Sequence, residues 1–148
     1  MTGRAVAEFC HERGIPHKVF DEKGSPAEQF TEKDAGECGL IVRSPSFAMG
    51  HKWVVLALEN GCRCVTELEF ASCFWRGKIV AITGTNGKTT TTEFVVHALS
   101  SLGHLAVACG NVGRTFIEIT DLPMNSEKAW AIVEVSSFQM DGSKNFVP

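Results

Sequence analysis

The residues of this 148-residue chain that could do chemistry gather just after one short apolar run. Residues 79–82 (Ile-Val-Ala-Ile) predict a buried β-strand, and a turn with glycines at 84 and 87 follows at once. Lys88 and Thr89 open the next segment, whose apolar residues recur at helical spacing. That spacing predicts an amphipathic helix packed on a sheet through one face, made of Phe94, Val95, Ala98, Leu99 and Leu102.

A strand, a glycine-containing turn and a helix in this order form a cradle for phosphate groups. Small turn residues let backbone N–H groups approach phosphate oxygens, and the amino end of the helix adds partial positive charge. We expect the Lys88 ammonium to reach the β- and γ-phosphates of a nucleoside triphosphate and the Thr89 hydroxyl to ligate Mg²⁺. The residues expected to bind the nucleotide are Gly84, Thr85, Asn86, Gly87, Lys88, Thr89 and Thr90.

Two interpretations of this turn compete. The general phosphate-loop pattern has a glycine five residues before Gly87, where this chain has Ile82. An ordinary strand-to-helix turn with an exposed lysine is therefore one interpretation. The order of strand, turn, Lys-Thr and helix favours the other, which is a subtype of the loop that binds a nucleoside triphosphate.

Composition indicates an ordinary globular protein. Hydrophobic residues make up 44% of the chain and charged residues 21%. A net charge of −3 without a run of Lys or Arg argues against nucleic acid as a partner. No apolar stretch reaches the roughly 18 residues of a membrane span, and the first residues do not resemble a signal peptide. We therefore expect a cytoplasmic protein without membrane contact.

The six cysteines and five histidines are scattered along the chain. No Cys-x-x-Cys or His-x-x-x-His pair occurs, and the two thiols of Cys62-Arg-Cys64 have no second pair at zinc spacing. We expect no metal site built from sulfur or imidazole. The cysteines are expected to be small buried hydrophobic residues.

Helices and short strands alternate along the first half of the chain. Helices are expected over 5–13, 51–60 and 67–73, strands over 17–20, 40–42 and 64–66, and a loop with one helical turn over 22–37. This alternation predicts an α/β fold with parallel strands and crossover helices. A second unit of the same kind starts at Lys78, so we expect one domain over residues 1–76 and another over 77–148.

The second unit contains two further strands that lead into polar residues. Residues 104–109 run into Gly110-Asn-Val-Gly113, and residues 129–135 carry Glu134 at their end. In an open parallel sheet, ligands bind beyond the carboxyl ends of the strands, so these loops should meet the phosphate loop. A carboxylate at such a strand end is suited to hold Mg²⁺, which points to Glu134.

Three motifs together resemble the Mur ligase family. Residues 83–90 (Thr-Gly-Thr-Asn-Gly-Lys-Thr-Thr) are similar to its ATP loop, which has the same shortened glycine pattern. Residues 110–113 (Gly-Asn-Val-Gly) and 133–139 (Val-Glu-Val-Ser-Ser-Phe-Gln) resemble the member that adds D-glutamate to UDP-N-acetylmuramoyl-L-alanine in peptidoglycan synthesis. Folylpolyglutamate synthases share the ATP loop and are the nearest alternative among ligases. Parts of residues 2–70 also resemble the first domain of the family.

The resemblance implies a fold, a reaction and a set of residues. The fold would be a Rossmann-like, UDP-binding domain followed by part of a phosphate-loop α/β domain. The reaction would be ATP-dependent amide formation through an acyl phosphate, carried out by a cytoplasmic monomer. Lys88 and Glu134 would be catalytic, with Thr89 and Glu134 holding Mg²⁺. The substrate-side residues would be Thr2, Asp21, Lys23, Asn111, Ser136 and Gln139.

Several of these assignments have simpler alternatives. Asn111 could merely support a left-handed turn between two glycines. Ser136 could merely cap a short helix. Glu134 could be an ordinary polar residue at the end of a strand.

The chain also departs from the family pattern. The family has a strand before the position of Thr2, Ser-Pro-Gly where this chain has Ser44-Pro45-Ser46, and a D-glutamate-binding domain beyond the position of Pro148. We therefore expect a fragment of a ligase, with an exposed sheet edge, that does not catalyse the reaction alone. The alternatives are a nucleotide-binding remnant without ligase activity and an unrelated phosphate-loop kinase or GTPase, which has no place for Ser-Ser-Phe-Gln.

Overall fold

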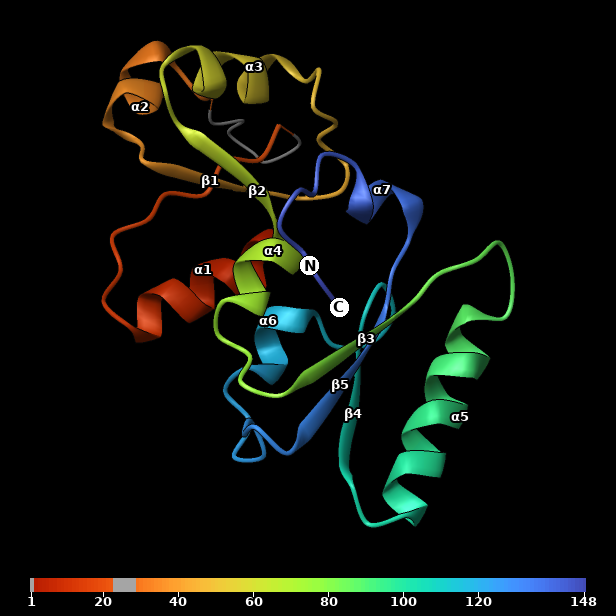
Figure 1. The fold of residues 1–148 in the computed structure, drawn as a ribbon. Coiled ribbons are helices and arrows are strands. Elements are labelled where there is room, and N and C mark those ends of the chain that lie inside the picture. Colours follow the sequence, from red (N-terminus) through yellow and green to blue (C-terminus); the bar gives the residue numbers. More distant parts are fainter. Residues whose placement is uncertain (1, 23–28) are drawn as a thin grey trace.

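The computed structural model describes residues 2–22 and 29–148, and these form helices and strands in alternation (Figure 1). The first half carries α1 (Thr2–Glu12), α2 (Glu32–Glu37), β1 (Leu40–Arg43), α3 (Lys52–Glu59), β2 (Arg63–Thr66) and α4 (Glu67–Ser72). The second half carries β3 (Lys78–Ile82), α5 (Lys88–Ser101), β4 (Leu105–Gly110), α6 (Phe116–Ile119), β5 (Ala129–Glu134) and α7 (Ser137–Met140). The strand pairs are parallel, which confirms the predicted α/β class.

The strands form two small sheets. β1 pairs with β2, and the three strands of the second half are arranged in the order β3-β5-β4. β5 is in register with both neighbours to its last residue, so Glu134 lies beside Ile82 on one side and Gly110 on the other. The carboxyl ends of β3, β4 and β5 therefore meet at one edge, where the predicted phosphate loop and the loop that begins at Asn111 (the Asn111 loop) both start.

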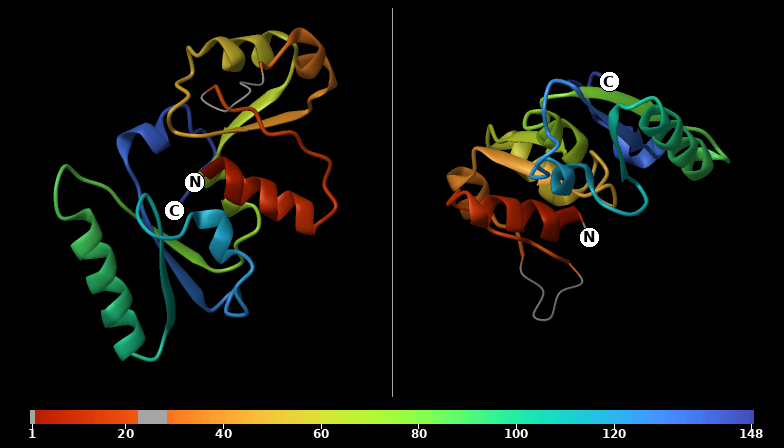
Figure 2. Two further views of the ribbon diagram at one scale, coloured as in Figure 1. Left: turned by 180° about the vertical axis from the view of Figure 1, so that it is seen from behind. Right: turned by 90° about the horizontal axis from the view of Figure 1, so that it is seen from below.

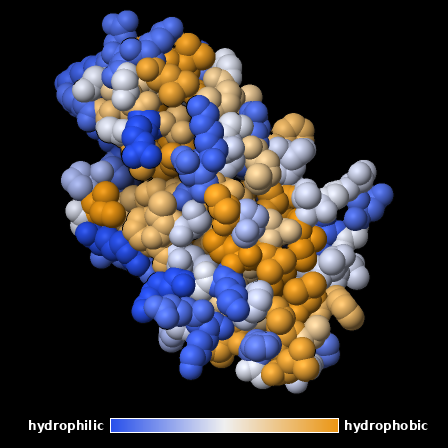
Figure 3. Space-filling view, in the orientation of Figure 1, coloured by the Kyte–Doolittle hydropathy of each residue, from blue (hydrophilic) through white to orange (hydrophobic). Residues whose placement is uncertain are grey.

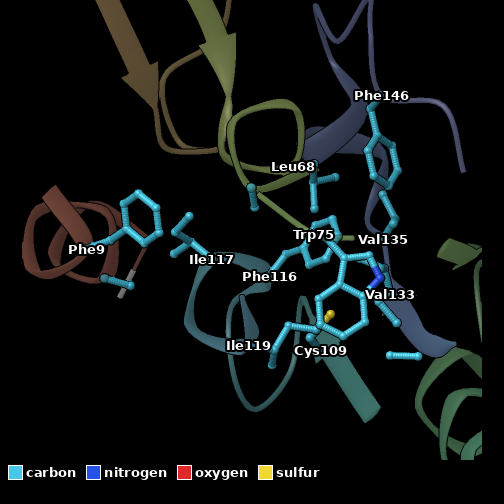
Figure 4. Close-up of a cluster of buried hydrophobic side chains, with 14 of the residues drawn as sticks. Phe9, Leu68, Trp75, Cys109, Phe116, Ile117, Ile119, Val133, Val135 and Phe146 are labelled. Atoms are coloured by element: carbon cyan, nitrogen blue, oxygen red, sulfur yellow. The ribbon is translucent and has the colours of Figure 1, made fainter. Parts of the chain in front are cut away.

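The main hydrophobic core lies between this three-stranded sheet and helices α1, α4 and α6. Alternate residues of β5 point into it, with Ala131 and Val133 fully buried. α6 fills its centre with Phe116, and Leu68 of α4 packs beside it (Figure 4). α1 lies against α6, with Phe9 at the margin of the core (Figures 2 and 4). Side chains from both halves of the chain thus share one core.

α5 packs on β4 and β5 on the opposite face of the sheet, where Ile132 points. The predicted apolar face of this helix is wrong at two positions, because Phe94 is 69% exposed and Leu102 is 75% exposed. The buried position of the helix is Thr92. Phe94 is two residues further on, which turns it by about 200° to the solvent side, and Leu102 lies just beyond the last helical residue.

One predicted strand is not formed. Residues 17–20 have no regular secondary structure and pair with neither sheet. A strand is stabilised by its hydrogen-bonded neighbour, and the sequence of this segment supplies strand propensity but no partner. The helices and strands expected elsewhere are present, and their ends differ from the expected ones by at most three residues.

The cysteines differ in burial, contrary to the expectation that all are buried. Cys10, Cys62 and Cys109 are buried, but Cys73 is exposed, and all six thiols are free. Within the described residues, no group of three or more His, Cys, Asp or Glu side chains could hold a metal ion.

Hydrophobic side chains also reach the surface. Figure 3 shows them as a band across the middle of the face that carries β3. The exposed large hydrophobic residues of the second half are Phe94, Leu102, Leu105, Val112, Phe138, Met140 and Val147. In the part of the chain that the structure describes, none of the helices is long and apolar enough to cross a membrane.

Candidate nucleotide and substrate site

The turn between β3 and α5 has the backbone that a phosphate cradle needs. Gly87 precedes the helix in the left-handed conformation, with φ +76°, which a residue with a side chain adopts only at a cost. Gly87 is the N-cap residue and has no side chain to cap the first amides of α5, and the first turn of the helix contains no acidic residue. The amino end of this 14-residue helix is therefore suited to bind an anion.

Lys88 is folded back over this turn. Its Nζ donates a hydrogen bond to the carbonyl oxygen of Gly84, 3.0 Å away. The residues of the turn, 84–87, are exposed, and Lys88 is half-buried. The ammonium group is thus held beside open backbone amides, where a phosphate group would be neutralised.

Glu134 lies at the centre of the site and is only 3% exposed. Its Oε2 accepts a hydrogen bond from the Thr89 hydroxyl at 2.7 Å, and its Oε1 accepts one from Asn111 Nδ2 at 3.1 Å. The backbone N–H of Asn111 also donates a hydrogen bond to the backbone carbonyl oxygen of Glu134, at 2.8 Å. Residues predicted separately from three loops are therefore in direct contact.

Gly110 makes this contact sterically feasible. It has φ +113°, and a Cβ atom there would lie 2.2 Å from the carbonyl oxygen of Glu134. That distance is far below van der Waals contact, so a side chain would push the Asn111 loop away from β5. Glycine at position 110 therefore allows the backbone at 110 to approach the backbone of Glu134 closely, in addition to its role in a turn.

The donor set fits a magnesium ion. Mg²⁺ prefers oxygen ligands and is bound in nucleotide sites by one or two carboxylates together with phosphate oxygens. Thr89 Oγ1 and Glu134 Oε2 are a hydroxyl and a carboxylate within hydrogen-bond distance of each other, so one small cation could contact both. The Thr89 hydroxyl and the Asn111 side-chain amide, which donate hydrogen bonds to the buried Glu134 carboxylate, are both neutral, so a bound ion would add positive charge beside it.

Ser136 and Gln139 form hydrogen bonds with each other. The amide and hydroxyl of Ser136 donate to Gln139 Oε1 at 3.0 and 3.1 Å, and the amide of Gln139 donates to the Ser136 hydroxyl oxygen at 3.4 Å. This is a capping box at the start of α7. The simpler alternative for Ser136 is thus what this structure shows, and a role in substrate binding stays a prediction.

The remaining substrate-side residues lie in the first half of the chain. Thr2 begins α1, and Asp21 follows the segment without regular secondary structure. Lys23 lies outside the described residues. Their predicted contact with the uridine diphosphate end of a substrate is not tested by this geometry.

Two buried carboxylates near the site were not predicted. Glu67 is 4% exposed, and its Oε1 accepts a hydrogen bond from the amide of Ile117 at 2.7 Å. Burial raises the pKa of Glu67 to about 7, against the opposing effect of hydrogen bonds from the amides of Ile117 and Phe116. Glu69 is 5% exposed and accepts hydrogen bonds from the amides of Lys144 and Asn145.

The sequence contained only part of the signal for these two residues. Thr66-Glu-Leu-Glu69 has the Thr-x-x-Glu spacing of a capping box, which the structure contains at the start of α4. The spacing predicts the local cap. It does not predict bonds to backbone amides about 50 and 75 residues away.

Comparison with known proteins gives consistent matches. Residues 82–146 match the family described as Mur ligase middle domain. Three similar proteins, each named UDP-N-acetylmuramoylalanine--D-glutamate ligase, come from Geobacter sp. strain M21 (41% identical), Caldicellulosiruptor bescii (36%) and Bacillus subtilis (30%). Each alignment covers 99% of this chain and 36% of the relative. The chain therefore spans about a third of the length of the curated relatives it matches.

Proposed function

This chain belongs to the Mur ligase family, and we propose that it supplies the ATP-binding portion and part of the substrate-binding portion of a ligase. In this proposal, the ligase joins D-glutamate to UDP-N-acetylmuramoyl-L-alanine. The observation that carries the proposal is the Thr89–Glu134 hydrogen bond, which joins the phosphate loop to the carboxyl end of β5. In this proposal, residues 1–76 bind the uridine nucleotide and residues 77–148 bind ATP. The ligase would act on small molecules in the cytoplasm as a monomer.

The chemistry of amide formation explains what such a site has to do. A carboxylate is a poor electrophile, so ATP first phosphorylates the carboxylate of the muramoyl-alanine substrate to an acyl phosphate. The amine of D-glutamate then attacks the acyl carbon, and phosphate leaves from the tetrahedral intermediate. Phosphoryl transfer depends mainly on positioning and on neutralising charge at the γ-phosphoryl oxygens.

The residues of this chain can provide both. The amides at the start of α5 and the Lys88 ammonium hold and neutralise the phosphate groups. Thr89 and Glu134 would hold Mg²⁺, which when bound supplies positive charge to the phosphate oxygens. No covalent protein nucleophile is required, and burial raises the pKa of the Cys109 thiol well above its usual range, which leaves it unreactive.

Asn111 is the substrate-side residue best supported by the geometry. It is exposed, and its amide group lies on the Glu134 carboxylate, beside the expected metal position. From there it could orient the reacting carboxylate of the substrate next to the γ-phosphate. Ser136 and Gln139 follow β5 at the same edge of the sheet, and Thr2, Asp21 and Lys23 are assigned to the uridine diphosphate end.

Binding of Mg·ATP to Lys88→Ala tests the nucleotide site. Isothermal titration should show at least a tenfold weaker affinity in Lys88→Ala, because one charge-assisted contact to phosphate is lost. Lys33→Ala, at an exposed lysine of α2, is the matched control and should bind like the unmodified chain. Equal affinity in Lys88→Ala and Lys33→Ala would refute the assignment of the cradle.

A second titration separates the ligase from its alternatives. Binding of UDP-N-acetylmuramoyl-L-alanine supports the proposed substrate, and binding of a folate instead would support a folylpolyglutamate synthase. Binding of Mg·ATP with neither of these ligands would support a nucleotide-binding remnant.

A further inference from the structure

The two oxygens of the Glu69 carboxylate have different partners. Oε2 accepts hydrogen bonds from the amide and the hydroxyl of Thr66, at 3.0 and 3.4 Å, and so completes the capping box of α4. Oε1 accepts hydrogen bonds from the amides of Lys144 and Asn145, both at 2.7 Å. One oxygen is thus used locally, and the other holds a segment that is 75 residues further along the chain.

A cap alone does not account for this arrangement. The same kind of box starts α2, where Asp34 caps Thr31 from a partly exposed position and accepts a bond from the Lys18 side chain. Glu69 instead is buried, and its second oxygen receives two backbone amides from a distant segment. Removing that oxygen would leave those two amides without this acceptor at a part-buried position.

Glu69 is ionised at neutral pH. Burial raises the pKa of this carboxyl group, but the hydrogen bonds from Thr66, Asn145 and Lys144 outweigh burial and hold it below its usual range. A carboxylate can accept bonds from all these donors at once, because both of its oxygens are acceptors. The negative charge strengthens each bond.

The segment that Glu69 holds leads directly out of α7. Gly142 packs so closely on the first half of the chain that a Cβ atom there would lie 2.5 Å from Met49 Sδ. After Lys144 and Asn145, the ring of Phe146 enters the main core and packs against Phe116 (Figure 4). Glu69 therefore lies between the two places where this segment is anchored.

We propose that Glu69 is a positioning residue for the substrate side of the site, which acts by holding the segment that fixes α7. The turn that starts α7 carries Ser136 and Gln139, two predicted substrate residues, and it follows Glu134 directly. The inference rests on the proposed function, since it concerns the same sugar-nucleotide substrate. It adds a residue from the first half of the chain that sets the geometry of the second.

Glu69→Gln tests the proposal with little change in size. A glutamine side chain has one acceptor oxygen and one NH₂ group. If the oxygen accepts from the amides of Lys144 and Asn145, the NH₂ group faces the amide of Thr66. If the side chain is turned the other way, the NH₂ group faces the amides of Lys144 and Asn145. We expect faster hydrogen exchange at the amides of Lys144 and Asn145. We also expect about tenfold weaker binding of UDP-N-acetylmuramoyl-L-alanine, with unchanged affinity for Mg·ATP.

Two further variants make the test decisive. Asp34→Asn changes the matched carboxylate of the α2 box and should alter neither ligand affinity. Glu69→Asp keeps the charge but shortens the reach, so it should fall between Glu69→Gln and the unmodified chain. Unchanged Mg·ATP affinity in each variant shows that the fold is retained.

The outcomes separate the inference from the proposed function. If the unmodified chain binds the sugar nucleotide and Glu69→Gln binds it equally well, the inference is overturned and the proposed function stands. If the unmodified chain does not bind the sugar nucleotide, the proposed substrate fails, and the inference fails with it. A loss of substrate affinity confined to the Glu69 variants supports both.

Discussion

The Thr89 hydroxyl donates a hydrogen bond to Glu134 Oε2 over 2.7 Å, between residues that are 45 positions apart in the chain. This bond exists because β3 and β5 are parallel neighbours whose carboxyl ends coincide. It places a hydroxyl and a carboxylate where the turn at 84–87 leads into α5, and it is the contact from which the proposed nucleotide site is inferred.

The first prediction concerns this pair. Thr89→Val removes the hydroxyl and keeps the shape of the side chain, so Mg²⁺ should no longer strengthen ATP binding by as much as in the unmodified chain. Titration with ATP in the presence of Mg²⁺ or of a chelator measures the difference. Thr89→Ser retains the hydroxyl and should preserve the Mg²⁺ effect, and a Thr89→Val protein with the full effect would rule out Thr89 as a ligand.

The second prediction concerns Gly110. Gly110→Ala places a Cβ atom 2.2 Å from the carbonyl oxygen of Glu134 in a backbone conformation that alanine disfavours. The free energy of unfolding should fall by about 3 kcal/mol or more. Gly103→Ala is the control, because Gly103 has φ +84° but no atom near its Cβ position. It should cost only about 1–2 kcal/mol, and equal losses in urea denaturation would contradict the steric explanation.

The third prediction compares two phenylalanines. Phe116 is fully buried in the main core, whereas Phe94 is 69% exposed on α5. Phe116→Ala should lower the free energy of unfolding by about 3–5 kcal/mol, and Phe94→Ala should change it by less than about 1 kcal/mol. A large loss in Phe94→Ala would mean that α5 packs through the face that the sequence pattern first suggested.

The fourth prediction concerns pH. The pKa of Glu67 is raised to about 7 by burial, so the folded protein binds a proton that the unfolded chain has released above its ordinary pKa of 4.5. The stability that comes from protonated Glu67 is therefore complete below about pH 4.5 and is lost as pH rises through about 7. Glu118 and Cys109 face this carboxyl group, and the negative charge of Glu118 raises its pKa further.

Glu67→Gln isolates that effect, because glutamine mimics the protonated form at every pH. Relative to the unmodified chain, Glu67→Gln should gain about 2–3 kcal/mol between pH 4.5 and 7.5 in urea denaturation. In the unmodified chain, the NMR chemical shift of the Ile117 backbone amide should change with a midpoint near pH 7, since this amide donates a hydrogen bond to Glu67. A constant difference between the two proteins across this range would contradict a raised pKa.

Much of the site could be predicted from the sequence, because its signals are local. A strand, a glycine turn and Lys-Thr specify a phosphate loop through backbone geometry, and the rule that ligands bind at the carboxyl ends of parallel strands brought Glu134 and Asn111 to the same edge. The structure places these side chains within hydrogen-bond distance. Each signal lies within one turn or one strand end.

The parts that could not be predicted depend on distant partners. The segment at 17–20 has strand propensity, but strand formation needs a neighbour that the local sequence does not specify. Glu67 and Glu69 were predicted only as part of the helix at 67–73, and their bonds to Ile117, Lys144 and Asn145 arise from packing between the two halves. Phe94 was misplaced because apolar residues occur on more than one side of α5.

The strand order β3-β5-β4 also has a consequence for biosynthesis. β3 and β4 leave the ribosome well before β5, yet in the finished sheet they touch only β5 and never each other. The nascent chain therefore carries Thr89 for 45 residues before Glu134 is translated. Until β5 inserts between the two earlier strands, the proposed nucleotide site lacks the Glu134 carboxylate, so tight Mg·ATP binding would report that insertion.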